Sequence, residues 1–149
     1  RRRSVYLQTA YEKQSDFMML FDVASVNECY KRSPSIVPQQ ALVLSNSAMV
    51  LGEARRLATT LSSHPVQENK EFIHAACIHL LTRQPTQDET NLCEQFLESQ
   101  TELLSQTDHL THFTGGPEPM IEPSSDPHQR AREDLVHMLM NHNDFITVR

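Results

Sequence analysis

The cysteines carry the most reactive side chains of this 149-residue sequence, and there are three of them. Cys77 and Cys93 lie at similar distances on either side of the Gln84-Pro85 turn. This tight connection predicts that the helices on either side form an antiparallel hairpin. The two thiols would then reach the same level, and a disulfide between them is allowed in an oxidising compartment. The alternative is a pair of small buried thiols, which needs no special geometry. The disulfide would leave Cys29 unpaired.

Eight histidines and six methionines raise the question of a metal or haem site. His109 and His112 are one helical turn apart, but they lie in a polar stretch without helical periodicity. No set of His, Cys, Asp and Glu has the spacing of a structural or catalytic zinc site. Cys77-Ile78-His79 is not a haem-attachment motif. The sequence therefore predicts no metal-binding residue and no cofactor.

A nucleophilic or acid–base site needs a nucleophile beside a base in a cleft. Ser45 and Ser47 have no such partner nearby in the sequence, and the motif G-x-S-x-G does not occur. We therefore predict no catalytic residue. Catalytic triads assemble from distant positions, so part of an enzyme remains the alternative interpretation.

The composition argues against several classes of function. Three glycines, and the absence of G-x-G-x-x-G and G-x-x-x-x-G-K-[ST], argue against a phosphate-binding loop. A net charge of −6 argues against a nucleic-acid binder, because that role uses a positive surface. No apolar run approaches the ~20 residues that span a bilayer. The first residue is Arg1 rather than Met, so we expect a piece of a longer protein.

The stretch 38–61 is predicted to form the central helix, against which the other helices pack. Its apolar residues have helical spacing, and Pro38 suits a first helical turn, where its missing N–H costs nothing. The half between Ala41 and Leu51 is apolar on nearly all sides, which indicates burial by several neighbours. The residues predicted to face the core are Ala41, Leu44, Ala48, Leu51, Ala58 and Leu61.

Three more helices are predicted further along the chain. Apolar spacing places them over 68–81, from Thr86 to about 104, and from Asp126 onwards. Thr86 and Glu89 form a capping-box sequence at the start of the second, and an Asp-Pro pair opens the third. The residues predicted to face inward are Phe72, Ile73, Ala76, Cys77 and Leu80, then Leu92, Cys93, Phe96, Leu97, Gln100 and Leu104, and finally Ala131, Leu135, Met138, Leu139, His142 and Phe145.

Together these elements predict a mainly α fold. We expect a single domain over 1–149, built as an irregular bundle of about four main helices with an extended N-terminal arm over 1–16. The segment 105–125 is predicted to be a long flexible loop, because its polar residues and prolines bury too little surface to offset their ordering entropy.

The segment 22–36 has no clear periodicity and is predicted to be an irregular connection that wraps the core. Asp22 paired with Arg32, or with Arg2, would hold this segment in place as a buried ion pair. Such a pair would have a structural role.

Polar residues within the predicted apolar helices are also expected to be structural. Asn46 lies in the half predicted to be most buried, where an unpaired amide costs about 1–3 kcal/mol, so it should bond to another backbone segment. Gln40, in the first turn, is expected to satisfy a loop carbonyl. Asn141 and Asn143 end the last helix and are expected to cap it or to hold a neighbour.

Several short motifs occur together in an order that resembles a known family. They are Arg2-Arg3-Ser4-Val5-Tyr6, Phe21-Asp22, Cys29 with Arg32, Pro38-Gln39-Gln40-Ala41-Leu42, Leu44 with Asn46, Leu81 to Thr86 with Glu89, and Leu139 to Phe145. The chain resembles the C-terminal part of planctomycete-specific domain one, a domain of unknown function. The resemblance covers most of the chain except residues 105–125.

The resemblance implies a set of motif positions but no catalytic role, because it brings no reaction with it. These positions are Arg2, Tyr6, Phe21, Asp22, Arg32, Pro38, Gln40, Asn46, Arg83, Pro85, Asn141, Asn143 and Phe145. Asp144 is a departure, since Glu is more common there in the family. The family's domain closes large exported proteins that often carry a cytochrome c-like domain and a second uncharacterised domain upstream; their haem-attachment motif does not occur in this chain.

From these observations we expect a non-catalytic helical module with a structural or protein-interaction role. Its partners would be upstream domains of an exported, cytochrome c-like parent protein or a second copy of the chain, and the resemblance implies an extracytoplasmic or secreted location. The alternative is part of an enzyme, acting on polysaccharide or in redox chemistry, whose reactive groups lie upstream.

Overall fold

A computed structural model describes residues 18, 20–21, 37–63, 68–106 and 119–146, and the statements below concern these residues. Six helices lie within them, without any strand, so the predicted mainly α fold is confirmed. None of these helices combines the length and apolarity needed to cross a bilayer. The chain divides into two compact units, Arg1–Val43 and Leu44–Arg149. The predicted N-terminal arm and the connection over 22–36 lie outside the described residues.

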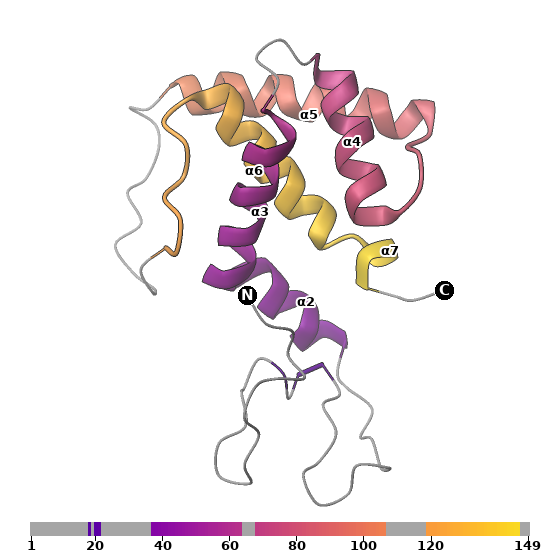
Figure 1. The fold of residues 1–149 in the computed structure, drawn as a ribbon, viewed down its shortest axis with the longest axis vertical. Coiled ribbons are helices and arrows are strands. Elements are labelled where there is room, and N and C mark those ends of the chain that lie inside the picture. The colour runs from indigo at the N-terminus through magenta and orange to yellow at the C-terminus, as the bar shows by residue number, and fades with distance from the viewer. Residues whose placement is uncertain (1–17, 19, 22–36, 64–67, 107–118, 147–149) are drawn as a thin grey trace, which may run out of the picture. The chain divides into compact units, whose positions relative to one another are not determined.

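The stretch predicted to be one central helix forms two, α2 (Val37–Asn46) and α3 (Ala48–Leu61) (Figure 1). Ser47 interrupts them with an extended backbone, and its carbonyl accepts the N–H of Leu51 as α3 begins. Three small polar residues in a row, Ser45 to Ser47, favour this break, because such side chains compete with helical hydrogen bonds. Asn46 is exposed at the end of α2, so its predicted burial is wrong.

The central helix of the second unit is α6 (Pro127–Met140), not the stretch 38–61. Its most extensive contacts are with α3 and α5, and it also contacts α4 and α7 (Figure 1). The apolar pattern concealed this role, because two of its buried residues are Arg132 and Glu133. The largest side chains of the core are Phe72, Ile73, Leu97, Leu135 and Val136.

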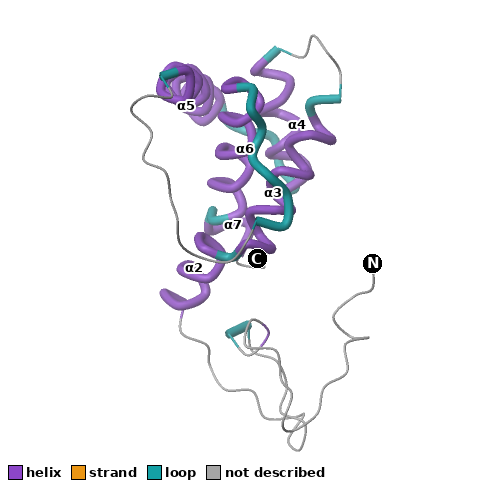
Figure 2. The backbone as a smooth tube through the Cα atoms, turned by 90° about the vertical axis from the view of Figure 1, so that its left-hand side faces the viewer, coloured by secondary structure: helices purple, strands orange, loops and turns teal. Residues whose placement is uncertain are grey.

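The helices α4 (Asn69–Leu81) and α5 (Gln87–Ser105) are joined by a short turn, as predicted, but they do not lie antiparallel. Figures 1 and 2 show them inclined steeply to each other, with α5 seen end-on in the second view. The predicted capping box of α5 is confirmed, and so is most of the predicted core face of α4, although Leu80 is half-buried and Leu81 is buried instead. On α5, however, Leu92 is exposed and Phe96 is only half-buried, because α6 covers a narrower stripe than the apolar pattern predicts.

The start of α6 is confirmed, since the Asp126 carboxylate accepts the N–H groups of His128 and Gln129. This helix ends at Met140, earlier than predicted, and α7 (Asn143–Ile146) follows as a separate short helix. Beyond this break His142 and Phe145, which were predicted to face inward, are exposed. Met138, within α6, is exposed as well, against the prediction.

Of the predicted loop over 105–125, Ser105 is the last residue of α5, and residues 119–125 lie against α3. Gly52 allows the close approach, because a Cβ at this position would lie 3.3 Å from the Cβ of Met120. The Arg55 guanidinium donates to the carbonyl of Ile121. The stretch 119–125 is thus part of the packed structure of the second unit.

Candidate functional site: an arginine–carboxylate cluster

The best-defined polar site begins where α4 ends. Thr82 follows the helix with φ 57°, a left-handed conformation that side chains rarely adopt, and its hydroxyl donates to the carbonyl of Leu81. This conformation stops α4 and places Arg83 at the start of the turn. Thr86 then forms the N-cap of α5, which begins at Gln87.

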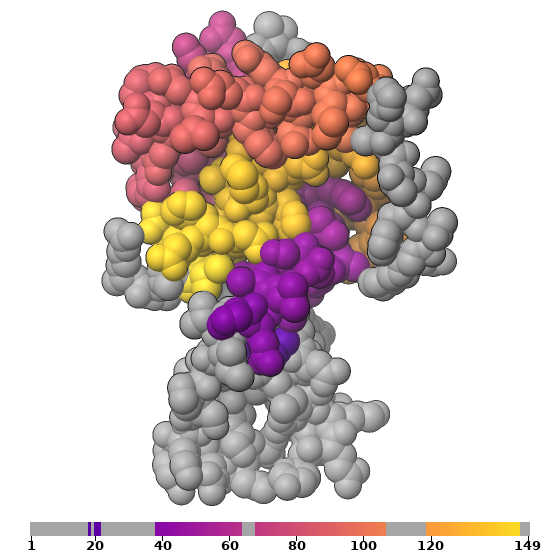
Figure 3. Space-filling view, turned by 180° about the vertical axis from the view of Figure 1, so that it is seen from behind, coloured from indigo at the N-terminus to yellow at the C-terminus, as the bar shows by residue number. Residues whose placement is uncertain are grey.

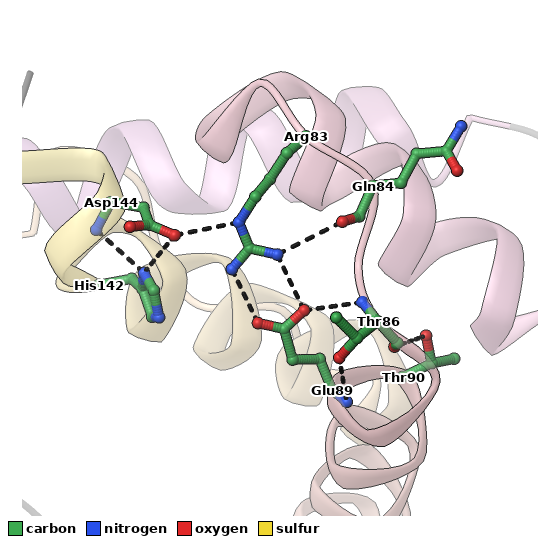
Figure 4. Close-up of polar contacts among 7 residues, drawn as sticks. All are labelled: Arg83, Gln84, Thr86, Glu89, Thr90, His142 and Asp144. Atoms are coloured by element: carbon green, nitrogen blue, oxygen red, sulfur yellow. Dashed lines mark hydrogen bonds and ion pairs between the residues drawn. The ribbon is translucent and has the colours of Figure 1, made fainter. Parts of the chain in front are cut away.

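Arg83 binds two carboxylates that are far apart in the sequence (Figure 4). Its Nη1 and Nη2 donate to the two carboxylate oxygens of Glu89 at 2.9 and 2.7 Å, a bidentate pair. Its Nε donates to Oδ2 of Asp144 at 3.0 Å. Because Asp144 belongs to α7, one guanidinium joins the α4–α5 turn to the last helix of the second unit.

Glu89 belongs both to the arginine–carboxylate cluster and to the capping box at the start of α5. One carboxylate oxygen accepts the Thr86 N–H at 2.8 Å, while the Thr86 hydroxyl accepts the Glu89 N–H at 3.3 Å, which is the predicted capping box. The hydrogen bonds from Arg83, and then the one from the Thr86 backbone, lower the pKa of Glu89 to about 2. The carboxylate therefore stays ionised through the ordinary pH range.

The far side of the cluster is held by the backbone of α7. The Asp144 N–H donates to Nδ1 of His142 at 3.1 Å, and this ring nitrogen lies 3.8 Å from the Asp144 carboxylate (Figure 4). The hydrogen bonds that Arg83 donates to Glu89 and to Asp144 raise the pKa of its guanidinium, so its charge is permanent. A fixed cation between two fixed anions suits the positioning of helices rather than proton transfer.

A second polar contact lies inside the second unit, around Arg132. Its guanidinium carbon is 4.7 Å from the centroid of the Phe72 ring, and its Nη1 donates to the Ser62 hydroxyl at 3.1 Å. Burial lowers its pKa, and the charge of Asp126 opposes this effect. The buried cation is stabilised by the ring face and by hydrogen bonds, and it connects α6 to α4 and to the end of α3.

Glu133, beside it on α6, holds the stretch 119–125. Its carboxylate accepts the Ser124 N–H at 3.2 Å and lies 3.9 Å from Nε of Arg55. Burial raises the pKa of Glu133, while the Ser124 hydrogen bond and Arg55 oppose the shift. Desolvation also raises the pKa of Asp134, against the charges of Arg130, His137 and Arg55. No sequence motif predicted that Arg132 and Glu133 are buried.

The cysteines of α4 and α5 are free, buried thiols. Of the two arrangements left open by the sequence, the structure has the one without a bridge. Burial raises the pKa of Cys77, and it raises the pKa of Cys93 to about 11, with Cys77 as the second cause. Both thiols are therefore neutral and weak nucleophiles near neutral pH. Cys29 lies outside the described residues.

Two of the predicted polar contacts are present. The Gln40 side chain is buried, and its Nε2 donates to the carbonyl of Leu20 at 2.8 Å, as expected for a loop carbonyl. Asn141 forms the C-cap of α6, where its Nδ2 donates to the His137 carbonyl at 2.9 Å and its Oδ1 accepts the Ser45 hydroxyl at 3.0 Å.

The remaining motif positions are dispersed. Pro38 is in the first turn of α2, Pro85 in the α4–α5 turn and Asn143 at the start of α7. Phe21 is half-buried and donates its N–H to the Met18 carbonyl. Motif positions that lie outside the described residues are Arg2, Tyr6, Asp22 and Arg32. The pairing of Arg83 with Asp144 was missed, because it depends on α7 folding back to the turn.

Within the described ranges, no group of three His, Cys, Asp or Glu side chains is placed to hold a metal ion. The polar side chains that converge there are the cluster of Arg83, Glu89 and Asp144 and the buried charges of α6. Each connects helices or holds a backbone segment.

A known protein family matches a large part of this chain. The model of the family PSD1, described as a protein of unknown function (DUF1553), matches residues 1–97. The chain belongs to this family. The PSD1 match includes Arg83 and Glu89, whereas Asp144 lies beyond it, so the cluster links the matched part to the helix that follows. No curated protein and no solved structure gave a match.

Proposed function

We propose that this PSD1-family chain is a non-catalytic helical module that docks onto other segments of the protein to which it belongs. The sequence resemblance further supports an exported parent that carries a cytochrome c-like domain, and hence an extracytoplasmic location. In this proposal the polar clusters keep the helices in a fixed arrangement, and apolar side chains on the outside provide the contacts.

The observation that carries the proposal is the number of large apolar side chains left on the surface. Among the residues that the structure describes, eight such side chains are at least 40% exposed. They are Leu42, Met49, Ile78, Leu92, Leu103, Met120, Met138 and Phe145. Covering such side chains is favourable by roughly 25 cal/mol per Å² of apolar surface removed from water, so they provide binding free energy to a partner that fits them.

Hydroxyl-radical footprinting tests the proposal, because it labels exposed Met, Phe and Leu side chains. The chain purified alone is compared with the same residues in the full-length encoded protein, and the buried Phe72 serves as the unlabelled reference. We expect several of the eight side chains to lose labelling in the full-length protein. Equal labelling of all eight in both samples would contradict docking.

A further inference from the structure

The outer side of α5 carries an apolar stripe with the spacing of a coiled-coil seam. The stripe consists of Leu92, Phe96 and Leu103, with the polar Ser99 between the last two, and the intervals of four, three and four residues are those of alternating d and a heptad positions. Leu92 is 67% exposed and Leu103 is 52% exposed. The stripe lies beside the buried face of the helix, which consists of Cys93, Leu97 and Leu104.

The length and position of α5 suit a docking surface. It is the longest described helix, with 19 residues, and its capping box and Arg83 fix its first turn. Figure 3 shows α5 extending along one face of the second unit. A partner helix lying along it would therefore meet a straight and preorganised surface, which lowers the entropic cost of binding.

The charge of α5 defines the partner's chemistry. The helix carries five carboxylates and no Lys or Arg. They are Asp88, Glu89, Glu94, Glu98 and Glu102. Glu89 is bound to Arg83, whereas Asp88 and Glu102 occupy two of the three g positions that flank the stripe, the third being Gln95. In coiled coils these flanking positions pair with opposite charges on the partner helix, so a complementary helix is basic at its edges.

A second copy of the chain does not provide this complement through the same face. In an antiparallel pair of α5 helices the g positions face each other, and carboxylate would oppose carboxylate. In a parallel pair the partner positions are Cys93 and Gln100, which carry no positive charge. An anionic lipid surface is repelled for the same reason.

We propose that the α5 stripe, Leu92, Phe96 and Leu103 with Asp88 and Glu102 at its edge, is the docking site for a basic amphipathic helix of a protein partner. This inference rests on the proposed function and names the surface and the chemistry of its partner. The apolar stripe supplies binding free energy, and the carboxylates supply orientation and selectivity.

The probe is a synthetic three-heptad helical peptide with Leu at a and d positions and Lys at e and g positions, and its affinity for the chain is measured by fluorescence anisotropy. We expect L92Q/L103Q to weaken binding at least tenfold. D88N/E102Q should weaken it several-fold and reduce its salt dependence, because exposed charge pairs are screened by salt. Ile78→Gln removes an exposed apolar side chain from α4 and should leave the affinity unchanged.

Two control peptides distinguish specific binding to the α5 stripe from non-specific hydrophobic or electrostatic binding. One has the same composition in an order without an apolar face, and the other has Glu in place of Lys. Circular dichroism checks that every variant remains helical. The inference is overturned if the basic peptide does not bind, if L92Q/L103Q binds it as tightly as the wild type, if the acidic peptide binds equally, or if the chain self-associates through α5.

Footprinting of the full-length protein distinguishes this inference from the proposed function. Protection of Leu92, Phe96 and Leu103 supports both. Protection confined to other residues, such as Met49 and Met138, leaves the module proposal standing and refutes the α5 site. Absence of any protection refutes both.

Discussion

Arg83 connects three parts of the second unit, which are the α4–α5 turn, the start of α5 and α7. It donates two hydrogen bonds to Glu89 at the start of α5 and one to Asp144 in α7, an arrangement that suits the planar fork of a guanidinium. Lysine would bring the same charge but a single ammonium group.

Glu89→Gln tests the cluster through its pH dependence. The folded-state pKa of Glu89 is about 2, against an ordinary value of 4.5, so its stabilising effect is complete above pH 4.5 and is lost as the pH falls through about 2. At pH 7 we expect the variant to lose about 1 kcal/mol, the usual value of a helix cap, reduced by salt because the side chain is partly exposed. Urea unfolding at several pH values measures the difference.

The difference in unfolding free energy between wild type and Glu89→Gln should shrink as the pH decreases from 4.5 towards 2. Glu94→Gln is the matched control, since Glu94 lies on the same helix and outside the cluster. A difference that stays constant over this pH interval would mean that the ionised carboxylate contributes nothing.

Thr82 offers a test of backbone strain beside the same cluster. Its φ of 57° costs a residue with a Cβ on the order of 1–2 kcal/mol, whereas glycine adopts this conformation freely. We expect Thr82→Gly to raise the unfolding free energy by up to about 1 kcal/mol, after the greater chain entropy of glycine is subtracted. Thr82→Ala keeps the Cβ and should not stabilise. Equal effects of the two variants in thermal unfolding would argue against strain.

At the level of elements, the parts predicted correctly are those that local chemistry determines. The Thr86–Glu89 capping box and the Asp126 cap need only neighbouring residues, and both are present. Spacing also predicted four of the five buried residues of α4, all except Leu81. These features could be predicted because each is satisfied within one or two helical turns.

The parts predicted wrongly depend on contacts between elements. The break at Ser47 is an exception, because it has a local cause in the run of polar residues from Ser45 to Ser47. The central position of α6 cannot be inferred from periodicity, since α6 buries Arg132 and Glu133. Their burial becomes favourable only when Ser62, Phe72 and the Ser124 backbone N–H surround them. The candidate site was predicted only in part, because it too depends on contacts between elements. Glu89 was expected as a cap, while its arginine partner and Asp144 are brought together by the fold.

Gly52 tests how firmly the stretch 119–125 is held on α3. Alanine in a helix is favoured over glycine by about 1 kcal/mol, but its Cβ would lie 3.3 Å from the Cβ of Met120. Because Arg55 and Glu133 fix the same stretch, we expect Gly52→Ala to give none of this gain, and Gly52→Val to destabilise by about 1–3 kcal/mol.

Chemical denaturation measures both Gly52 variants, and the double variant with Met120→Gly provides the control. Removing the Met120 Cβ should allow Gly52→Ala to stabilise, so the two substitutions should be coupled. Additive effects would show that the stretch moves aside at no cost.

At the level of the whole molecule, the division into two units predicts that the second folds without the first. Its core side chains, including Phe72, Leu97 and Leu135, are buried by helices of the same unit. We therefore expect residues 37–149, expressed alone, to keep helical circular dichroism and a single cooperative thermal transition. In this fragment Leu135→Ala should lower the unfolding free energy by about 2–5 kcal/mol, because it opens a cavity in a core built by α6 and its neighbours. A fragment that melts without cooperativity, or whose transition ignores Leu135→Ala, would show that the order of α3 to α7 depends on residues before position 37.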